Sequence, residues 1–202
     1  MSQGIIARLG AASGVAFFML LIAGGGSDST VAVVLELLGL VLFLPFLAYL
    51  RGVLYVAEGP DGWLASCAFG AGLVDVTIKL ASIAPGKAAD HFATDTAVHQ
   101  ALRDMNNIAF IVTMLPLGIM MAAVAAVTLQ YGGLPRWLGW MAAVISPLLL
   151  VNSMFLDSPD GPAFLLFMVW TLLASSVLTL RVRPTRAIRT PDRARPTAEP
   201  TL

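Results

Sequence analysis

Residues 63–84 read WLASCAFGAGLVDVTIKLASIA, and this stretch combines the features of a membrane span with two charged residues. It is apolar and reaches the length of about 20 residues that a helix needs to cross a bilayer. It also carries Asp75 and Lys79, which are four residues apart and therefore share one helix face, with the acid first. An ionisable residue inside a membrane costs roughly 2.5–3.5 kcal/mol and usually faces a bundle interior or a cavity. The stretch thus predicts a membrane span and the place of a polar site.

The composition is that of a membrane protein. The chain has 202 residues, of which 58% are hydrophobic and 12% charged, whereas soluble domains carry about 25% charged residues. Each backbone polar group in lipid must be satisfied within its own segment, so apolar segments of this length form helices. We therefore expect an all-α, six-helix transmembrane bundle. The expected spans are Ile5–Ala23, Val31–Leu50, Trp63–Ala84, Asn107–Leu129, Trp137–Leu156 and Ala163–Leu180.

The placement of basic residues predicts the orientation of the bundle. Lys and Arg near the ends of spans concentrate on the cytoplasmic side. With six spans, most of the flanking arginines fall on one side: Arg8, Arg51, Arg136 and the tail residues Arg181, Arg183, Arg186, Arg189, Arg193 and Arg195. Only Lys87 and Arg103 fall on the other. We therefore expect a multi-pass protein of the plasma (cytoplasmic) membrane with both termini in the cytoplasm.

Two polar stretches complete the predicted organisation. Residues 1–182 form the transmembrane domain, and residues 183–202 form an Arg- and Pro-rich cytoplasmic tail that we expect to be disordered, because it has too little apolar surface to bury. The Pro85–Asn106 stretch is expected to be an external loop, with a short helix from Thr96 onward. Thr94 or Thr96 is the expected cap of that helix.

A candidate pocket follows from the depth of the polar residues in this topology. At a rise of 1.5 Å per residue, Glu36 and Lys79 each lie about 8 Å from the outer end of their spans, and Asp75 lies deeper. Asn106, Asn107 and Asn152 fall near the outer ends of two further spans. We also expect Glu36 to lie close enough to share Lys79 with Asp75. One lysine with two acids leaves one negative charge, so one of the two carboxyl groups is expected to hold a proton. We predict an outer-facing pocket that binds or passes a small solute, ion or proton.

A second interpretation stays open at this point. Asp75 and Lys79 could form a purely structural intramembrane pair, with Glu36 and Asn152 as interhelical hydrogen-bonding groups in a non-catalytic structural or accessory subunit. Lys79 could also reach the headgroups by extending its side chain. A closed ion pair without a cavity favours this interpretation, whereas a pocket lined by Glu36, Asp75 and Lys79 favours solute binding.

The sequence offers little for other functions. Two histidines eight residues apart, His91 and His99, do not make a metal site, and no cofactor is expected. Basic residues gather only in the Pro-rich tail, so there is no sign of nucleic-acid binding. No catalytic motif is present, so an enzyme acting on lipid ranks last. The expected partner is the lipid bilayer, and a partner protein is not indicated.

Two short motifs carry a family resemblance. At residues 102–107 the chain reads LRDMNN before an apolar span, and at residues 134–140 it reads LPRWLGW. With these motifs the chain resembles a family of uncharacterised bacterial multi-span integral membrane proteins. The resemblance covers most of the chain and implies six transmembrane helices. It implies no activity and no catalytic residue.

Overall fold

The computed structural model describes residues 3–25, 29–92, 95–156 and 162–181. The tail proposed for residues 183–202 lies outside these ranges. The described residues form an all-α fold with six helices long and apolar enough to cross a membrane, as expected. They are α1 (Gln3–Gly25), α2 (Ser29–Glu58), α3 (Leu64–Phe92), α4 (Thr96–Gln130), α5 (Arg136–Val151), continued by the short π-helix η1 (Asn152–Leu156), and α6 (Pro162–Arg181).

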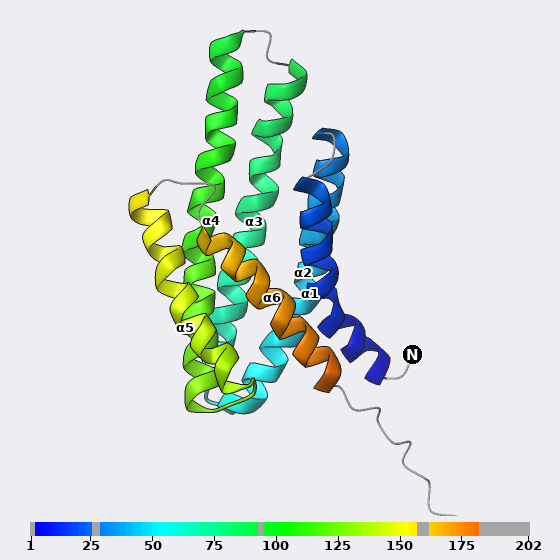
Figure 1. Ribbon diagram of the computed structural model, residues 1–202, viewed down its shortest axis with the longest axis vertical. Helices are drawn as coiled ribbons and strands as arrows, with labels where there is room; N and C mark the ends of the chain where they lie inside the picture. Colours follow the sequence, from blue (N-terminus) through cyan, green and yellow to red (C-terminus); the bar gives the residue numbers. More distant parts are fainter. Residues whose placement is uncertain (1–2, 26–28, 93–94, 157–161, 182–202) are drawn as a thin grey trace, which may run out of the picture.

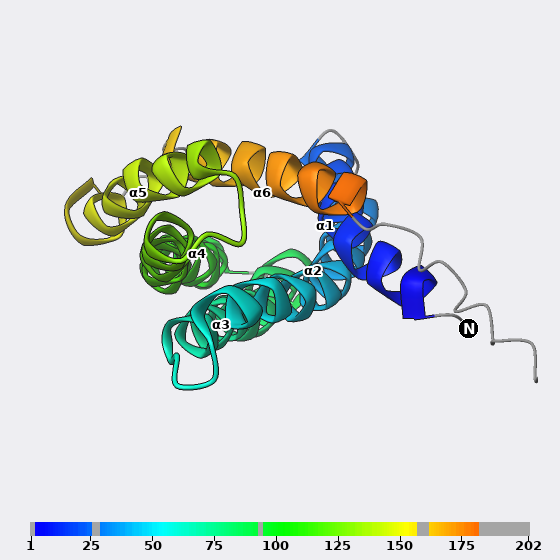
Figure 2. The ribbon, with the colours of Figure 1, turned by 90° about the horizontal axis from the view of Figure 1, so that it is seen from below.

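The helices form a closed ring. Each helix contacts the next one along the chain, and α6 returns to contact α1 (Figure 2). The start of α1 and the end of α6 lie toward the end of the bundle opposite to the connection between α3 and α4 (Figure 1). A ring of this kind encloses an interior that all of its helices can line, and this interior holds the candidate site.

The α3–α4 hairpin is longer than the sequence predicted and rises beyond the other helices (Figure 1). The prediction of a loop from Pro85 was wrong, because α3 continues through Pro85 to Phe92. A proline removes one helical hydrogen bond, and the hairpin's own packing offsets this loss. Arg103 Nη2 of α4 donates to Asp90 Oδ1 of α3 at 2.7 Å.

The helix predicted from Thr96 is present, but its cap differs from the one expected. The cap is Asp95, whose Oδ1 accepts a hydrogen bond from Ala97 N at 2.7 Å. Thr96 is the first residue of the helix, and Thr94 lies outside the described residues. Asp is as good an N-cap residue as Ser and better than Thr, because its carboxylate accepts from the free N–H groups of the first turn. From Thr96 the helix runs without a break into the fourth span.

Close packing at the ring closure bends α1. Ser175 of α6 donates its hydroxyl to Ala11 O and accepts from Val15 N at 3.0 Å. These are the two backbone groups that bond each other in an undisturbed helix. A side chain inserted in this way is a recognised cause of a helix bend, and α1 bends in Figure 1. Gly14 makes this approach possible, since a Cβ there would lie 2.9 Å from side chains of Phe46 and Ser175.

The aromatic side chains named here differ in their exposure to solvent. Trp170, in the middle of the last span, is fully buried and donates from Nε1 to Leu138 O at 3.0 Å. Five other aromatic side chains are exposed, and they lie at or beside the helix ends nearest the α2–α3 and α4–α5 connections: Tyr55, Trp63, Tyr131, Trp137 and Trp140. Exposed aromatic rings at one level are typical of the headgroup region.

Candidate functional site

A cavity of about 290 Å³ lies inside the helix ring, and we call it the inner cavity. Five of the six helices supply its walls, and the charged residues Glu36, Asp75 and Lys79 all line it. The other lining residues are apolar: Phe17, Leu21, Ile22, Leu40, Phe110, Phe164, Leu165, Phe167 and Met168. The structure thus brings together the three ionisable residues that the sequence singled out in α2 and α3.

Lys79 forms its ion pair with Glu36. Lys79 Nζ lies 3.5 Å from Glu36 Oε1, and the two side chains are 15% and 31% exposed. Lys79 Nζ also lies 3.9 Å from the centroid of the Phe110 ring, which is a cation–π distance. The pair therefore joins α2 to α3, and the ammonium group sits on an aromatic face of α4. The sequence predicts that Asp75 and Glu36 share Lys79; in this part of the structure the ion pair within 4.0 Å is with Glu36.

Asp75 lies deeper than the ion pair. It is 6% exposed, and Thr113 on α4 lies beside it. Thr113 Oγ1 donates to Phe110 O at 2.7 Å. Lys79 lies close enough to Asp75 to interact with it electrostatically, although no contact of 4.0 Å or less joins them among the described residues. Asp75 is therefore a carboxyl group held at the wall of the inner cavity without a cation in contact.

A second and more polar cavity adjoins the first toward the α3–α4 tip, and we call it the vestibule. Its volume is about 260 Å³. Its walls carry two of the predicted site residues, Asn106 and Asn107, and Glu36 lines both cavities. The remaining lining residues are Val33, Ile83, Gly86, Lys87, Asp90 and Arg103. The Glu36–Lys79 pair thus stands where the vestibule meets the inner cavity.

Asn152 is placed elsewhere. It begins η1, is buried, and its Nδ2 lies 2.7 Å from Met114 Sδ of α4. It is absent from the residues that line the inner cavity and the vestibule. Five of the six predicted site residues therefore fall on two adjoining cavities, while Asn152 joins α4 to the end of the fifth span.

The aromatic side chains that line the inner cavity were not predicted from the sequence. The ring of Phe164 meets that of Phe110 edge to face at 5.0 Å between centroids and lies 6.1 Å from Phe167. Phe17 of α1 completes the wall. Phe164 and Phe167 are three residues apart and share a face of α6, which is a signal the sequence does contain. The sequence does not show that this face packs against α4 and lies beside the charged residues of α2 and α3.

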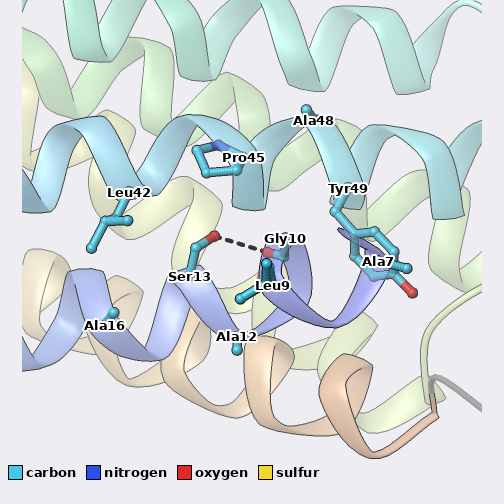
Figure 3. A pocket seen from close by; sticks show the side chains of 10 residues that line it. All are labelled: Ala7, Leu9, Gly10, Ala12, Ser13, Ala16, Leu42, Pro45, Ala48 and Tyr49. Carbon is cyan, nitrogen blue, oxygen red and sulfur yellow. Dashed lines mark hydrogen bonds between the residues drawn. The ribbon is translucent and has the colours of Figure 1, made fainter. Parts of the chain in front are cut away.

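An open groove of about 680 Å³ lies between α1 and α2 (Figure 3). Its walls come from small or apolar residues such as Gly10, Ala12 and Pro45. Ser13 is already engaged, because its Oγ donates to Gly10 O at 2.8 Å. The hydroxyl group of Tyr49 also lines the groove, and none of the lining residues is charged.

Comparisons with known proteins identify no family for this chain. No family model matches the chain, and no curated protein or solved structure is similar to it. The resemblance to bacterial multi-span proteins therefore stays a prediction. In the part of the chain that the structure describes, no group of three or more His, Cys, Asp or Glu side chains is placed to hold a metal ion.

Proposed function

We propose that this protein is a multi-pass protein of the cytoplasmic membrane that binds or passes a small solute, ion or proton through the vestibule and the inner cavity. The observation that carries the proposal is the meeting of Glu36, Asp75 and Lys79 at one cavity within the spans. Charged side chains at such depth are costly and usually mark a ligand or ion path. The vestibule adds a polar approach that shares Glu36 with the inner cavity.

The orientation forms part of the proposal. Among the described residues, four arginines flank the spans at the end of the bundle that carries the start of α1 and the end of α6: Arg8, Arg51, Arg136 and Arg181. By the positive-inside rule this end is the cytoplasmic one. The α3–α4 tip, with the vestibule beneath it, then faces outward. A solute from outside meets Lys87, Asp90 and Arg103 first.

A structural role is the second candidate, and the ion pairs support it. Glu36–Lys79 joins α2 to α3, and Arg103–Asp90 joins α3 to α4. A subunit that served only to hold helices together would need these contacts and no water-filled space beside them. The two candidates therefore differ in whether water reaches the inner cavity.

Thiol accessibility tests this difference. Single cysteines are introduced at Val33 of the vestibule and Leu40 of the inner cavity, in a Cys67→Ala background, and right-side-out vesicles are treated with a membrane-impermeant thiol reagent. Such reagents need a thiolate and therefore water. We expect both cysteines to react.

Matched controls come from the next residue along the same helix. Val34 and Val41 lie at nearly the same depths as Val33 and Leu40, but their side chains are exposed on the outside of the bundle. Cysteines at these two positions would face lipid and should stay unreacted. Equal protection of the Leu40 and Val41 cysteines would contradict the proposal and favour the structural role.

A further inference from the structure

The charges and rings of the inner cavity point to one class of ligand. Two carboxyl groups and one ammonium group line it, so an ionised set carries one uncompensated negative charge. The rest of the wall is apolar and includes four phenyl rings, those of Phe17, Phe110, Phe164 and Phe167. The negative face of an aromatic ring attracts cations, and this attraction grows when water is excluded. An anion would be repelled by the carboxylates and by the negative faces of the rings.

The structure already holds one ammonium group in this setting. Lys79 Nζ lies on the Phe110 ring and beside Glu36, at 3.9 Å and 3.5 Å respectively. This shows the contacts that an ammonium group makes in the cavity. Asp75 lines the same space, is almost fully buried, and has no cation in contact among the described residues. A second positive charge would therefore find a carboxyl group that Lys79 does not contact within 4.0 Å.

We propose that the inner cavity is a receptor for an organic monocation with an apolar body, such as a quaternary ammonium compound with one aromatic group. This rests on the proposed function and names its ligand class. The cationic head lies between Asp75 and the phenyl rings, and the apolar body lies along the α1 and α6 walls at Leu21 and Met168. A volume of about 290 Å³ restricts the ligand to a small one, since pockets for drug-sized molecules run from about 300 to 1,000 Å³.

Equilibrium binding with probes of one shape and three charges tests the proposal. The purified full-length protein in lipid nanodiscs is incubated with radiolabelled benzyltrimethylammonium, and binding to empty nanodiscs is subtracted. Unlabelled benzyltrimethylammonium, its neutral isostere neopentylbenzene and the anion benzylsulfonate serve as competitors. We expect the cation to compete at a concentration at least about tenfold below that of the neutral isostere, which corresponds to about 1.4 kcal/mol, and the anion not to compete.

Variants assign the preference to the cavity. Asp75→Asn should weaken cation binding at least tenfold, and Phe110→Leu should weaken binding of the cation more than that of the neutral isostere. Lys79→Met should strengthen cation binding, because it leaves both Glu36 and the Phe110 ring to the ligand. Asp61→Asn, in the connection between α2 and α3, is the control and should leave binding within twofold, because Asp61 lines neither the inner cavity nor the vestibule. Size-exclusion chromatography of each variant checks that it is folded.

The outcomes separate this inference from the proposed function. Equal competition by the cation and its neutral isostere, or binding that survives Asp75→Asn, overturns the cation preference. No binding of any probe also overturns it, while reactive cysteines at Val33 and Leu40 would keep the solute path. No binding together with an unreactive Leu40 cysteine overturns both.

Discussion

The Glu36–Lys79 pair should be the strongest ionic coupling among the described residues. We expect a double-mutant cycle with Glu36→Gln and Lys79→Met to show it. Coulomb's law gives about 5 kcal/mol for unit charges at the observed 3.5 Å if the effective dielectric constant is about 20. Both side chains keep some access to solvent or cavity, with 15% and 31% exposure, so the measured coupling will be smaller. We expect about 1–3 kcal/mol, the upper part of the range found for residues in contact.

The assay is reversible unfolding in mixed micelles, with the free energy of unfolding measured for the parent protein, both single variants and the double variant. Lys79→Met alone should cost more than the double replacement, because it leaves a carboxylate in an apolar setting without its partner. The Asp75→Asn and Lys79→Met cycle should give a smaller coupling, since the described residues show no direct contact between these two side chains.

An internal control comes from the α3–α4 tip. The Arg103–Asp90 contact is shorter, at 2.7 Å, but the Arg103 side chain is 60% exposed. Exposed pairs typically contribute between 0 and about 1 kcal/mol. A coupling at Glu36–Lys79 within about 0.5 kcal/mol of zero, or one below that of the tip pair, would refute the reasoning that burial strengthens the pair.

Three further predictions concern packing and topology. Gly14→Ala should destabilise the bundle, because the new Cβ would lie 2.9 Å from Phe46, whereas Gly70→Ala, which has open space, should be neutral in the same unfolding assay. A reporter fused after Asp95 should signal from outside the cell and one at the C-terminus from the cytoplasm; a cytoplasmic signal from the tip would reverse the orientation. Deletion of residues 184–202 should leave the protein folded in the membrane by size-exclusion chromatography, and its loss from the membrane would show that the tail is needed.

The helical spans could be predicted from the sequence because each is encoded locally. A run of about 20 apolar residues is enough to specify a spanning helix, and the six runs in the sequence correspond to the six helices.

The positions of the helix ends could not all be predicted in this way. The sequence predicts a loop from Pro85, but α3 continues through this residue, because contacts with residues of α4 stabilise the helix.

The candidate site could be predicted in part, because the depth of a residue within a span is also encoded locally. The depth of Glu36, Asp75 and Lys79 follows from counting residues along a span, so their grouping could be anticipated. The direction in which each side chain points depends on how the helices rotate against one another, which the count does not contain. Lys79 therefore contacts Glu36 of another helix instead of pairing with Asp75 of its own, and Asn152 turns toward Met114.

The central claim is that water reaches the inner cavity, and hydroxyl-radical footprinting of the unmodified protein in nanodiscs tests it most directly. Met168 and Met120 are both buried, but only Met168 lines the inner cavity. Radicals formed from water in the cavity should oxidise Met168 several-fold faster than Met120, as read by peptide mass spectrometry. Equal and slow oxidation of the two methionines would contradict the claim and would leave Glu36, Asp75 and Lys79 with a structural role.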